Sequence, residues 1–310
     1  MGHCFELAAL DRSRFRHFLV KTIARIINRS NNPTVFGANA TFVYELIPYL
    51  HESIKIVDLT HSFVPESDYP VERASLPYVG RLATRVVING KTKQDYANLY
   101  QAEGVPDDAL NNILVVHNKL NYPYWDLAQK DYSLPPLKVL FVGRNSPEKR
   151  IGLIARVAHA LRDEPVKFTF VGPDLERATA YATRSNLHFM GELTDSEALA
   201  RIYQEHHVIL IASRREGFPL VLAEGMAHGA VPVSTDVGGI SHHVQDGKNG
   251  FLVENSEDAN LIVQAIVTRL RYLVDHPEVL PKLGEAAQTE AYRSFAPEVF
   301  DRTWRELLTS

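Results

Sequence analysis

The alternation of apolar and polar residues divides the second half of the chain into short strands and helices. Continuous apolar runs such as VLFVG at 139–143 are typical of strands buried in a parallel sheet. In residues 149–162 apolar residues instead recur every three or four positions, which predicts a helix buried along one face, with Ile151, Ile154, Ala158 and Leu161 on that face. The expected strands are 138–143, 166–172, 187–191, 208–213, 231–235 and 250–254, and the expected helices are 149–162, 174–185, 195–206, 219–228, 240–245 and most of 257–308.

The first part of the chain shows the same alternation with fewer strands. The expected strands are 33–36, 54–60, 85–89 and 112–118, and the expected helices are 11–29, 39–51 and 91–103. Residues 122–138 are rich in Pro and Tyr and lack periodicity, so we interpret them as a linker. Because strands alternate with helices on both sides of it, we expect two α/β, Rossmann-like domains, 1–130 and 131–310.

Composition narrows the functional classes. The net charge of −4 argues against a nucleic-acid partner bound through overall charge. A single cysteine, Cys4, excludes an intrachain disulfide and favours a reducing compartment. The 13 histidines are scattered without metal-ligand spacing, and no apolar run has the length of a membrane span. We therefore expect a cytoplasmic protein with no metal site and no transmembrane segment.

Candidate functional residues cluster in 213–239. There Glu216 and Glu224 are eight positions apart, with a Gly-Phe-Pro turn between them. Pro219 is expected in the first turn of a helix whose free amides and dipole favour an anion, and Gly217 lets backbone approach a ligand. The helix separates the two acids by roughly 8 Å. A retaining glycosidase pair is only about 5–5.5 Å apart.

This spacing suits an elongated ligand with an anionic centre, such as a nucleotide sugar. The diphosphate would lie on the helix amides, the sugar hydroxyls on Glu216 and the ribose hydroxyls on Glu224, because carboxylates accept hydrogen bonds from hydroxyls. Two solvated surface acids are the alternative that the spacing leaves open.

Several motifs in order carry a family resemblance. SRREGFPLVLAEGMAHGAVPVST at 213–235 resembles the E-x7-E signature of family-4 retaining glycosyltransferases, which have the GT-B architecture of two Rossmann-like domains facing across a cleft. VLFVGRNSPEKR at 139–150 is similar to that family's loop in which an Arg and a Lys hold the donor diphosphate. The segments FMGELTDSEALARIYQEHHVILIAS and DVGGISHHVQDGKNGFLV also resemble the family. The resemblance covers 110–254 closely and 54–118 loosely.

This resemblance implies a set of site residues. Arg144 and Lys149 match the diphosphate-binding pair, and cations flanking a strand-to-helix turn would reinforce an anion site. His61, in DLTHSF, matches a family histidine that contacts the donor sugar, although a strand-end histidine bonded to backbone is the alternative. With Glu216 these form the expected catalytic set. The expected donor-binding residues are Gly143, Gly172, Leu193, Ser213, Gly217, Phe218, Pro219, Leu220 and Glu224. The fixed cations replace a metal, so no cofactor is implied besides the nucleotide-sugar donor.

The predicted activity is transfer of a hexose, with retention, from a nucleotide-diphosphate sugar to a carbohydrate or lipid-linked acceptor. A peripheral contact of the protein with a membrane is compatible with this activity. The family's first strand and glycine-rich loop are not found before residue 60, so the resemblance implies an incomplete N-terminal domain, in a fragment or a module of a longer polypeptide. Such a chain is expected to bind donor but to transfer slowly alone. A disaccharide phosphorylase on the same scaffold would leave Glu224 without a ribose partner. A non-catalytic nucleotide-sugar-binding module would bind without transfer.

Overall fold

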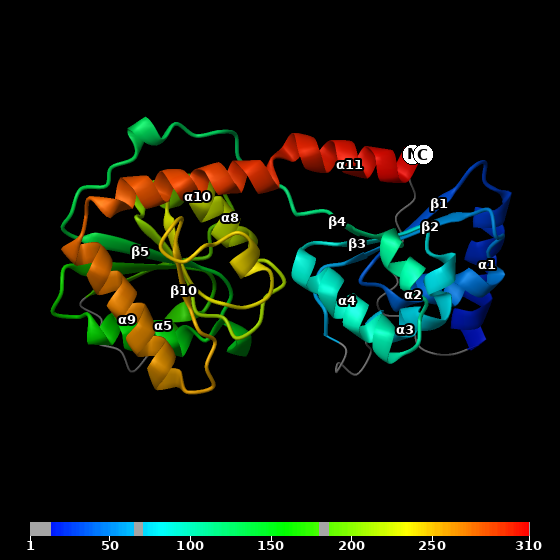
Figure 1. Cartoon of the computed structure of the whole chain (residues 1–310), viewed down its shortest axis with the longest axis horizontal. Coiled ribbons are helices and arrows are strands. Elements are labelled where there is room, and N and C mark those ends of the chain that lie inside the picture. Colours follow the sequence, from blue (N-terminus) through cyan, green and yellow to red (C-terminus); the bar gives the residue numbers. More distant parts are fainter. Residues whose placement is uncertain (1–13, 65–70, 180–185, 310) are drawn as a thin grey trace. The chain divides into compact units, whose positions relative to one another are not determined.

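Two compact units make up the chain, each built on its own parallel sheet (Figure 1). The computed structural model describes residues 14–64, 71–179 and 186–309. The first unit comprises Met1–Ile88, Thr92–Val116 and Thr303–Ser310, and the second comprises Asn89–Lys91 and His117–Arg302. Parallel strands joined by helices in both units confirm the predicted α/β class with two Rossmann-like sheets.

The first unit has a four-stranded sheet in which spatial order follows chain order, β1-β2-β3-β4. Its strands are β1 (Thr34–Ala38), β2 (Lys55–Thr60), β3 (Thr84–Val87) and β4 (Ile113–Val115). Its helices are α1 (Arg14–Arg29), α2 (Thr41–Leu46), α3 (Val71–Ser75) and α4 (Gly90–Ala102). Val20 and Ala24 of α1 pack with Val43 of α2 and Ile56 of β2 in one cluster of buried residues. The strands are therefore held by helices packed on a sheet face.

The second unit has a six-stranded parallel sheet in the order β10-β9-β8-β5-β6-β7. Its strands are β5 (Leu137–Val142), β6 (Val166–Val171), β7 (Leu187–Gly191), β8 (Val208–Ile211), β9 (Val231–Thr235) and β10 (Phe251–Val253). The helices that follow β5 are α5 (Ile151–Ala160), α6 (Leu175–Ala178), α7 (Ser196–Glu205), α8 (Leu220–Ala227), α9 (Ala259–Asp275), α10 (Val279–Phe295) and α11 (Pro297–Thr309). Asp195 caps α7 by accepting a hydrogen bond from the Glu197 amide.

Helices cover both faces of this sheet, as the continuous apolar strands predict. Ile151, Ile154, Ala158 and Leu161 are all buried, so the predicted face of α5 is confirmed. Together with α9 they form one large core with alternate residues of β5. Figure 1 shows α5 and α9 on one side of the sheet and α8 and α10 on the other. A ligand site is therefore expected at the strand ends, because helices occupy both faces of the sheet.

The order of the strands reverses once in this sheet. The chain runs from β5 outward through β6 and β7, and then returns to place β8 on the opposite side of β5. Consecutive loops therefore diverge beyond the carboxyl ends of β5 and β8. In open α/β sheets this switch point is where ligands bind.

The structure differs from the sequence prediction at several elements. The expectation that most of 257–308 is helical is confirmed, and these residues form three helices because Pro277 and Pro297 cannot continue the helices that precede them. The short helix α3 was not predicted. Within the predicted helix 174–185, α6 ends at Ala178, and residues 180–185 lie outside the described part of the chain.

The segment 122–138, interpreted from the sequence as a linker, is part of the second unit. Lys130 Nζ donates hydrogen bonds to the backbone oxygens of Tyr203, Gln204 and His206, at 3.1, 3.1 and 2.8 Å. These carbonyls end α7 and have no helical partner of their own. The Tyr132 hydroxyl donates to the Gly229 carbonyl at 2.9 Å. None of the helices in the described ranges is both long and apolar enough to span a membrane.

Candidate functional site at the switch point

An ion pair joins the two loops that leave the switch point. Lys149, in the turn after β5, donates from Nζ to Oε1 of Glu216 at 2.6 Å, and Glu216 follows β8. Ser213 Oγ donates to the same carboxylate oxygen at 2.6 Å. The Lys149 and Glu216 side chains are only 18% and 12% exposed. Three residues predicted to bind the donor are thus in direct contact, in a partly desolvated place where charge interactions are stronger.

The loop that carries Lys149 is braced by its neighbour Arg150. The Arg150 guanidinium donates to the backbone oxygens of Ala212 and Ser213, at 2.7 and 2.8 Å. The Thr235 hydroxyl also donates to the Ser213 carbonyl, at 2.7 Å. Sequence reasoning did not select Arg150, although its place next to Lys149 is the signal that could have done so. These bonds fix the backbone beneath the Lys149–Glu216 pair.

Two glycines permit backbones to approach each other at this end of the sheet. A Cβ on Gly172, after β6, would lie 1.9 Å from the Gly143 carbonyl oxygen after β5. A Cβ on Gly238, which has φ +60°, would lie 2.0 Å from the Glu216 carbonyl oxygen. The predicted donor residues Gly143 and Gly172 are therefore neighbours, and a side chain at 172 would force their loops apart.

The helix that follows Glu216 begins one residue later than expected. Pro219 is the N-cap, with extended backbone, and α8 begins at Leu220, so the prediction of Pro219 within the first turn is wrong. The fixed φ of proline suits this position as well, since its missing N–H would have no helical partner. Leu220 is 38% exposed, whereas Phe218 is buried and stacks on Phe295 with ring centroids 4.8 Å apart.

Glu224 lies in α8 with its carboxylate held by one neighbour. The Tyr203 hydroxyl donates to Oε2 at 2.8 Å, and this is the carboxylate's single partner within the described residues. Burial raises the pKa of Glu224, and the Tyr203 hydrogen bond partly offsets that shift. The second carboxylate oxygen therefore keeps its capacity to accept a hydrogen bond.

Arg144 and Leu193 lie in loops at the same end of the sheet. Arg144 follows Gly143 after β5, is exposed, and makes no hydrogen bond or ion pair with the residues that the structure describes. Leu193 is half-buried between β7 and α7. In the Arg144 loop, Ser146 Oγ is buried without a hydrogen-bond partner among described residues. An exposed cation and an unpaired hydroxyl in the same loop are groups that can bind an anionic oxygen.

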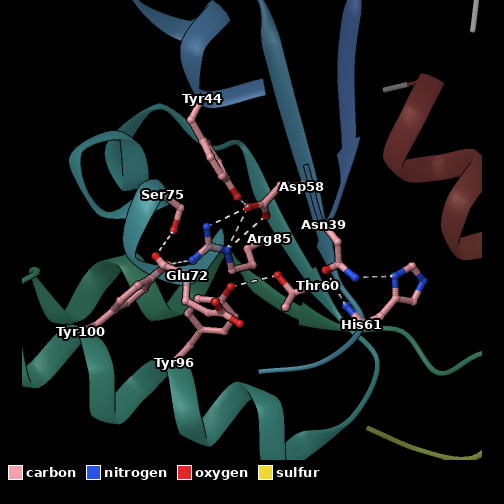
Figure 2. Close-up of polar contacts among 10 residues, drawn as sticks. All are labelled: Asn39, Tyr44, Asp58, Thr60, His61, Glu72, Ser75, Arg85, Tyr96 and Tyr100. Carbon is pink, nitrogen blue, oxygen red and sulfur yellow. Dashed lines mark hydrogen bonds and ion pairs between the residues drawn. The ribbon is translucent and has the colours of Figure 1, made fainter. Parts of the chain in front are cut away.

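The predicted residue His61 belongs to the first unit, where it follows β2 beside a buried polar network (Figure 2). On the same strand, Asp58 accepts a hydrogen bond at 2.7 Å from Arg85, and the two side chains are 4% and 1% exposed. Tyr44 donates to Asp58 at 2.6 Å, and Arg85 donates to the Tyr100 hydroxyl at 2.7 Å. The buried charges are therefore paired and bonded, which holds the strand that presents His61.

Metal-ligating side chains do not cluster in the described part of the chain. No group of three or more His, Cys, Asp or Glu side chains within the described ranges could hold a metal ion.

The fold and the site can now be compared with known proteins. A glycosyltransferase from Rickettsia africae has a similar structure, with a TM-score of 0.76 and 18% identity over 99% of this chain and 85% of that protein. Anabaena HepE, crystallised with UDP, gives a TM-score of 0.70 with 16% identity over 93% of this chain and 81% of that protein. The architecture is therefore that of the GT-B glycosyltransferases.

Sequence comparison relates the second unit to known glycosyltransferases. Residues 136–271 match the family model of glycosyl transferases group 1. An uncharacterised glycosyltransferase of Methanocaldococcus jannaschii is 25% identical over 66% of this chain and 56% of its own length. A D-inositol 3-phosphate glycosyltransferase of Thermomonospora curvata is 26% identical over 79% of this chain and 62% of its own length. The chain thus spans less than two thirds of these relatives.

Proposed function

We propose that the chain acts as a glycosyltransferase that moves a hexose, with retention, from a nucleoside-diphosphate sugar to a carbohydrate or lipid-linked acceptor. The observation that carries this proposal is the Lys149–Glu216 pair, which joins the loops after β5 and β8 where the strand order reverses. Retention and the hexose come from the resemblance to the family-4 enzymes.

Each site residue has a role in this reaction. The bond from the anomeric carbon to the donor diphosphate breaks, and negative charge develops on the leaving phosphate oxygen. Arg144, Lys149 and the first amides of α8 would stabilise that charge, because donors fixed in place need no reorganisation as the charge appears. Glu216 would accept hydrogen bonds from the sugar hydroxyls while it orients Lys149. His61 would contact the donor sugar, as its match to the family histidine implies.

Ligand-induced thermal stabilisation tests this proposal. UDP, GDP, ADP and their hexose derivatives would be compared, with UDP first because HepE binds it. We expect one nucleoside diphosphate to raise the melting temperature, since a ligand that binds only the folded state stabilises it. If none of the three raises it, the proposed donor site is wrong. Release of the diphosphate from the matching sugar then reports turnover by transfer or by hydrolysis.

The Glu224→Ala substitution should weaken binding of the selected nucleoside diphosphate. A hydrogen bond to a charged group contributes about 1.5–3 kcal/mol, which corresponds to about 10- to 150-fold in affinity. Isothermal titration calorimetry measures this loss. Glu224→Gln keeps one acceptor oxygen for Tyr203 and presents an NH2 group that can donate to a ribose hydroxyl oxygen, so it should retain more affinity than Glu224→Ala. Equal affinity of the Glu224→Ala and parent proteins would contradict the ribose assignment.

Chelation should leave turnover of the nucleotide sugar unchanged. The proposed site already supplies two cations, Arg144 and Lys149, to the diphosphate. Diphosphate release would be measured after dialysis against EDTA, with and without added magnesium or manganese. Loss of turnover in EDTA that either metal restores would show that a metal is required.

A further inference from the structure

Asn39 is positioned to control the hydrogen-bonding state of His61. The two residues follow β1 and β2, which are neighbouring parallel strands with Ala38 opposite Leu59. The backbone N–H of Asn39 continues the pairing of the two strands by donating to the Leu59 carbonyl at 2.9 Å. Asn39 has φ +47°, a left-handed conformation that asparagine tolerates better than most residues. The strand pairing and the positive φ together place the Asn39 side chain beside His61 (Figure 2).

Two contacts fix the orientation of the Asn39 amide. The His61 backbone N–H lies 3.1 Å from Oδ1 of Asn39, and Nδ2 of Asn39 lies 3.3 Å from Nδ1 of His61. A backbone N–H can only donate, so the atom that faces it must be the amide oxygen. The amide nitrogen is then left facing the imidazole, and it can only donate.

The state of the ring follows from this orientation. Because Nδ2 donates, Nδ1 of His61 must accept, and in a neutral imidazole the proton must then be on Nε2. We propose that Asn39 is a positioning residue that holds His61 as the Nε2–H tautomer, so that the exposed side of the ring donates a hydrogen bond to a hydroxyl of the donor sugar. This inference rests on the proposed function, in which His61 contacts that sugar.

The surroundings of the ring favour the same state. A protonated ring would direct an Nδ1–H at the Nδ2–H of Asn39, so the contact opposes a charged imidazole. Loss of water around the ring also lowers the pKa of His61. On β2 just before the histidine, Thr60 is buried and hydrogen-bonded to the Tyr96 hydroxyl at 2.9 Å. The backbone that presents the ring is thereby held in place.

The chain offers matched variants for a test. Asn39→Asp keeps the shape of the side chain and tolerates the positive φ, but a carboxylate facing Nδ1 can only accept. It should therefore invert the tautomer, with the proton on Nδ1 and an acceptor at Nε2. Asn39→Gly removes both side-chain bonds without strain at positive φ. Asn32 has the same φ of +47° and is exposed, so Asn32→Asp and Asn32→Gly control for charge and backbone.

Nitrogen-15 NMR of protein labelled in histidine reads the tautomer directly. Spectra would be recorded at about pH 8, where an unperturbed imidazole is neutral, and the His61 signals would be identified by their loss in His61→Gln. We expect a protonated Nε2 in the parent, a protonated Nδ1 in Asn39→Asp, a mixture in Asn39→Gly, and no change in the Asn32 variants. A parent ring protonated at Nδ1, or an unchanged tautomer in Asn39→Asp, would overturn the assignment.

The rate of diphosphate release tests whether the tautomer of His61 matters for the reaction. Asn39→Asp should lower diphosphate release about tenfold, the value of one neutral hydrogen bond, and Asn32→Asp should match the parent. Inverted tautomer with parental turnover would overturn the role in positioning the sugar. If the parent binds no nucleotide sugar, the proposed function fails, whereas the NMR result still decides whether Asn39 sets the tautomer.

Discussion

Replacing Lys149 by alanine should lower nucleoside-diphosphate release from the donor sugar about 100- to 1,000-fold, which is the usual cost of removing one fixed donor from a site of developing charge. The expectation follows from where the ammonium lies. It is largely buried, it is held by Glu216 at 2.6 Å, and its loop is braced by Arg150. A cation held in this way is already oriented when charge appears on the leaving phosphate, so its removal affects the barrier directly. Steady-state release of diphosphate, by transfer or hydrolysis, measures the effect.

Controls separate this role from a role in folding. Lys149→Arg keeps the charge and should retain more turnover than Lys149→Ala. Lys167→Ala removes an exposed lysine from the opposite, amino end of β6 and should be neutral. Melting temperatures must accompany each rate, because Lys149→Ala leaves Glu216 with Ser213 as its remaining partner. A well-folded Lys149→Ala protein that turns over at the parent rate would place the diphosphate elsewhere.

The Glu216 loop shows how far sequence alone could reach. The apolar runs predicted the strands, because a strand covered on both faces must be apolar at nearly every position. The predicted Lys149 and Glu216 meet because each follows the carboxyl end of a strand and those strands are neighbours. Strand order is a property of the sheet, however, and local pattern does not encode it. The contact between these residues was therefore visible only in the structure.

Other features escaped sequence reasoning for a different reason. Arg85 and Asp58 interrupt apolar strands and read as surface positions, yet both are buried because each neutralises the other. Lys130 lies in a segment without periodicity, and its function depends on carbonyls more than 70 residues away. Asn39 contacts His61, which follows the neighbouring strand β2. In each case the residue's partner is distant in sequence, so no local rule could select it.

Acidification from pH 6.5 to 5.5 should destabilise the second unit by about 2 kcal/mol through two buried histidines, because each must take up a proton when the unit unfolds. Burial lowers the pKa of His206 and of His207 to about 4. Both folded values lie below the unfolded value near 6.5, so this stability is complete only well above pH 6.5 and is lost as the pH falls toward 4. Each histidine contributes about 1 kcal/mol between pH 6.5 and 5.5, below the limit of about 1.4 kcal/mol per pH unit, because the unfolded imidazole is only half protonated at pH 6.5.

The hydrogen bonds of His206 explain why the neutral form is required. Its Nδ1 lies 2.6 Å from the Ile202 carbonyl oxygen and must donate, so Nε2 accepts from the Thr169 hydroxyl at 2.8 Å. Protonation would remove that acceptor and bury a charge. His207 likewise accepts from the Lys138 amide through Nδ1, at 3.1 Å. Carboxylates of ordinary pKa, near 4, contribute little to the slope above pH 5.5.

Urea unfolding followed by fluorescence can isolate this effect. The chain has two tryptophans, Trp125 in the second unit and Trp304 in the first, so Trp304→Phe leaves Trp125 as the reporter of the second unit. His206→Asn keeps a donor for the Ile202 carbonyl but cannot titrate. It should lower stability at pH 7, since the bond to Thr169 is lost, and should reduce the loss of stability between pH 6.5 and 5.5 by about 1 kcal/mol. An unchanged slope in His206→Asn would show that protons are taken up elsewhere.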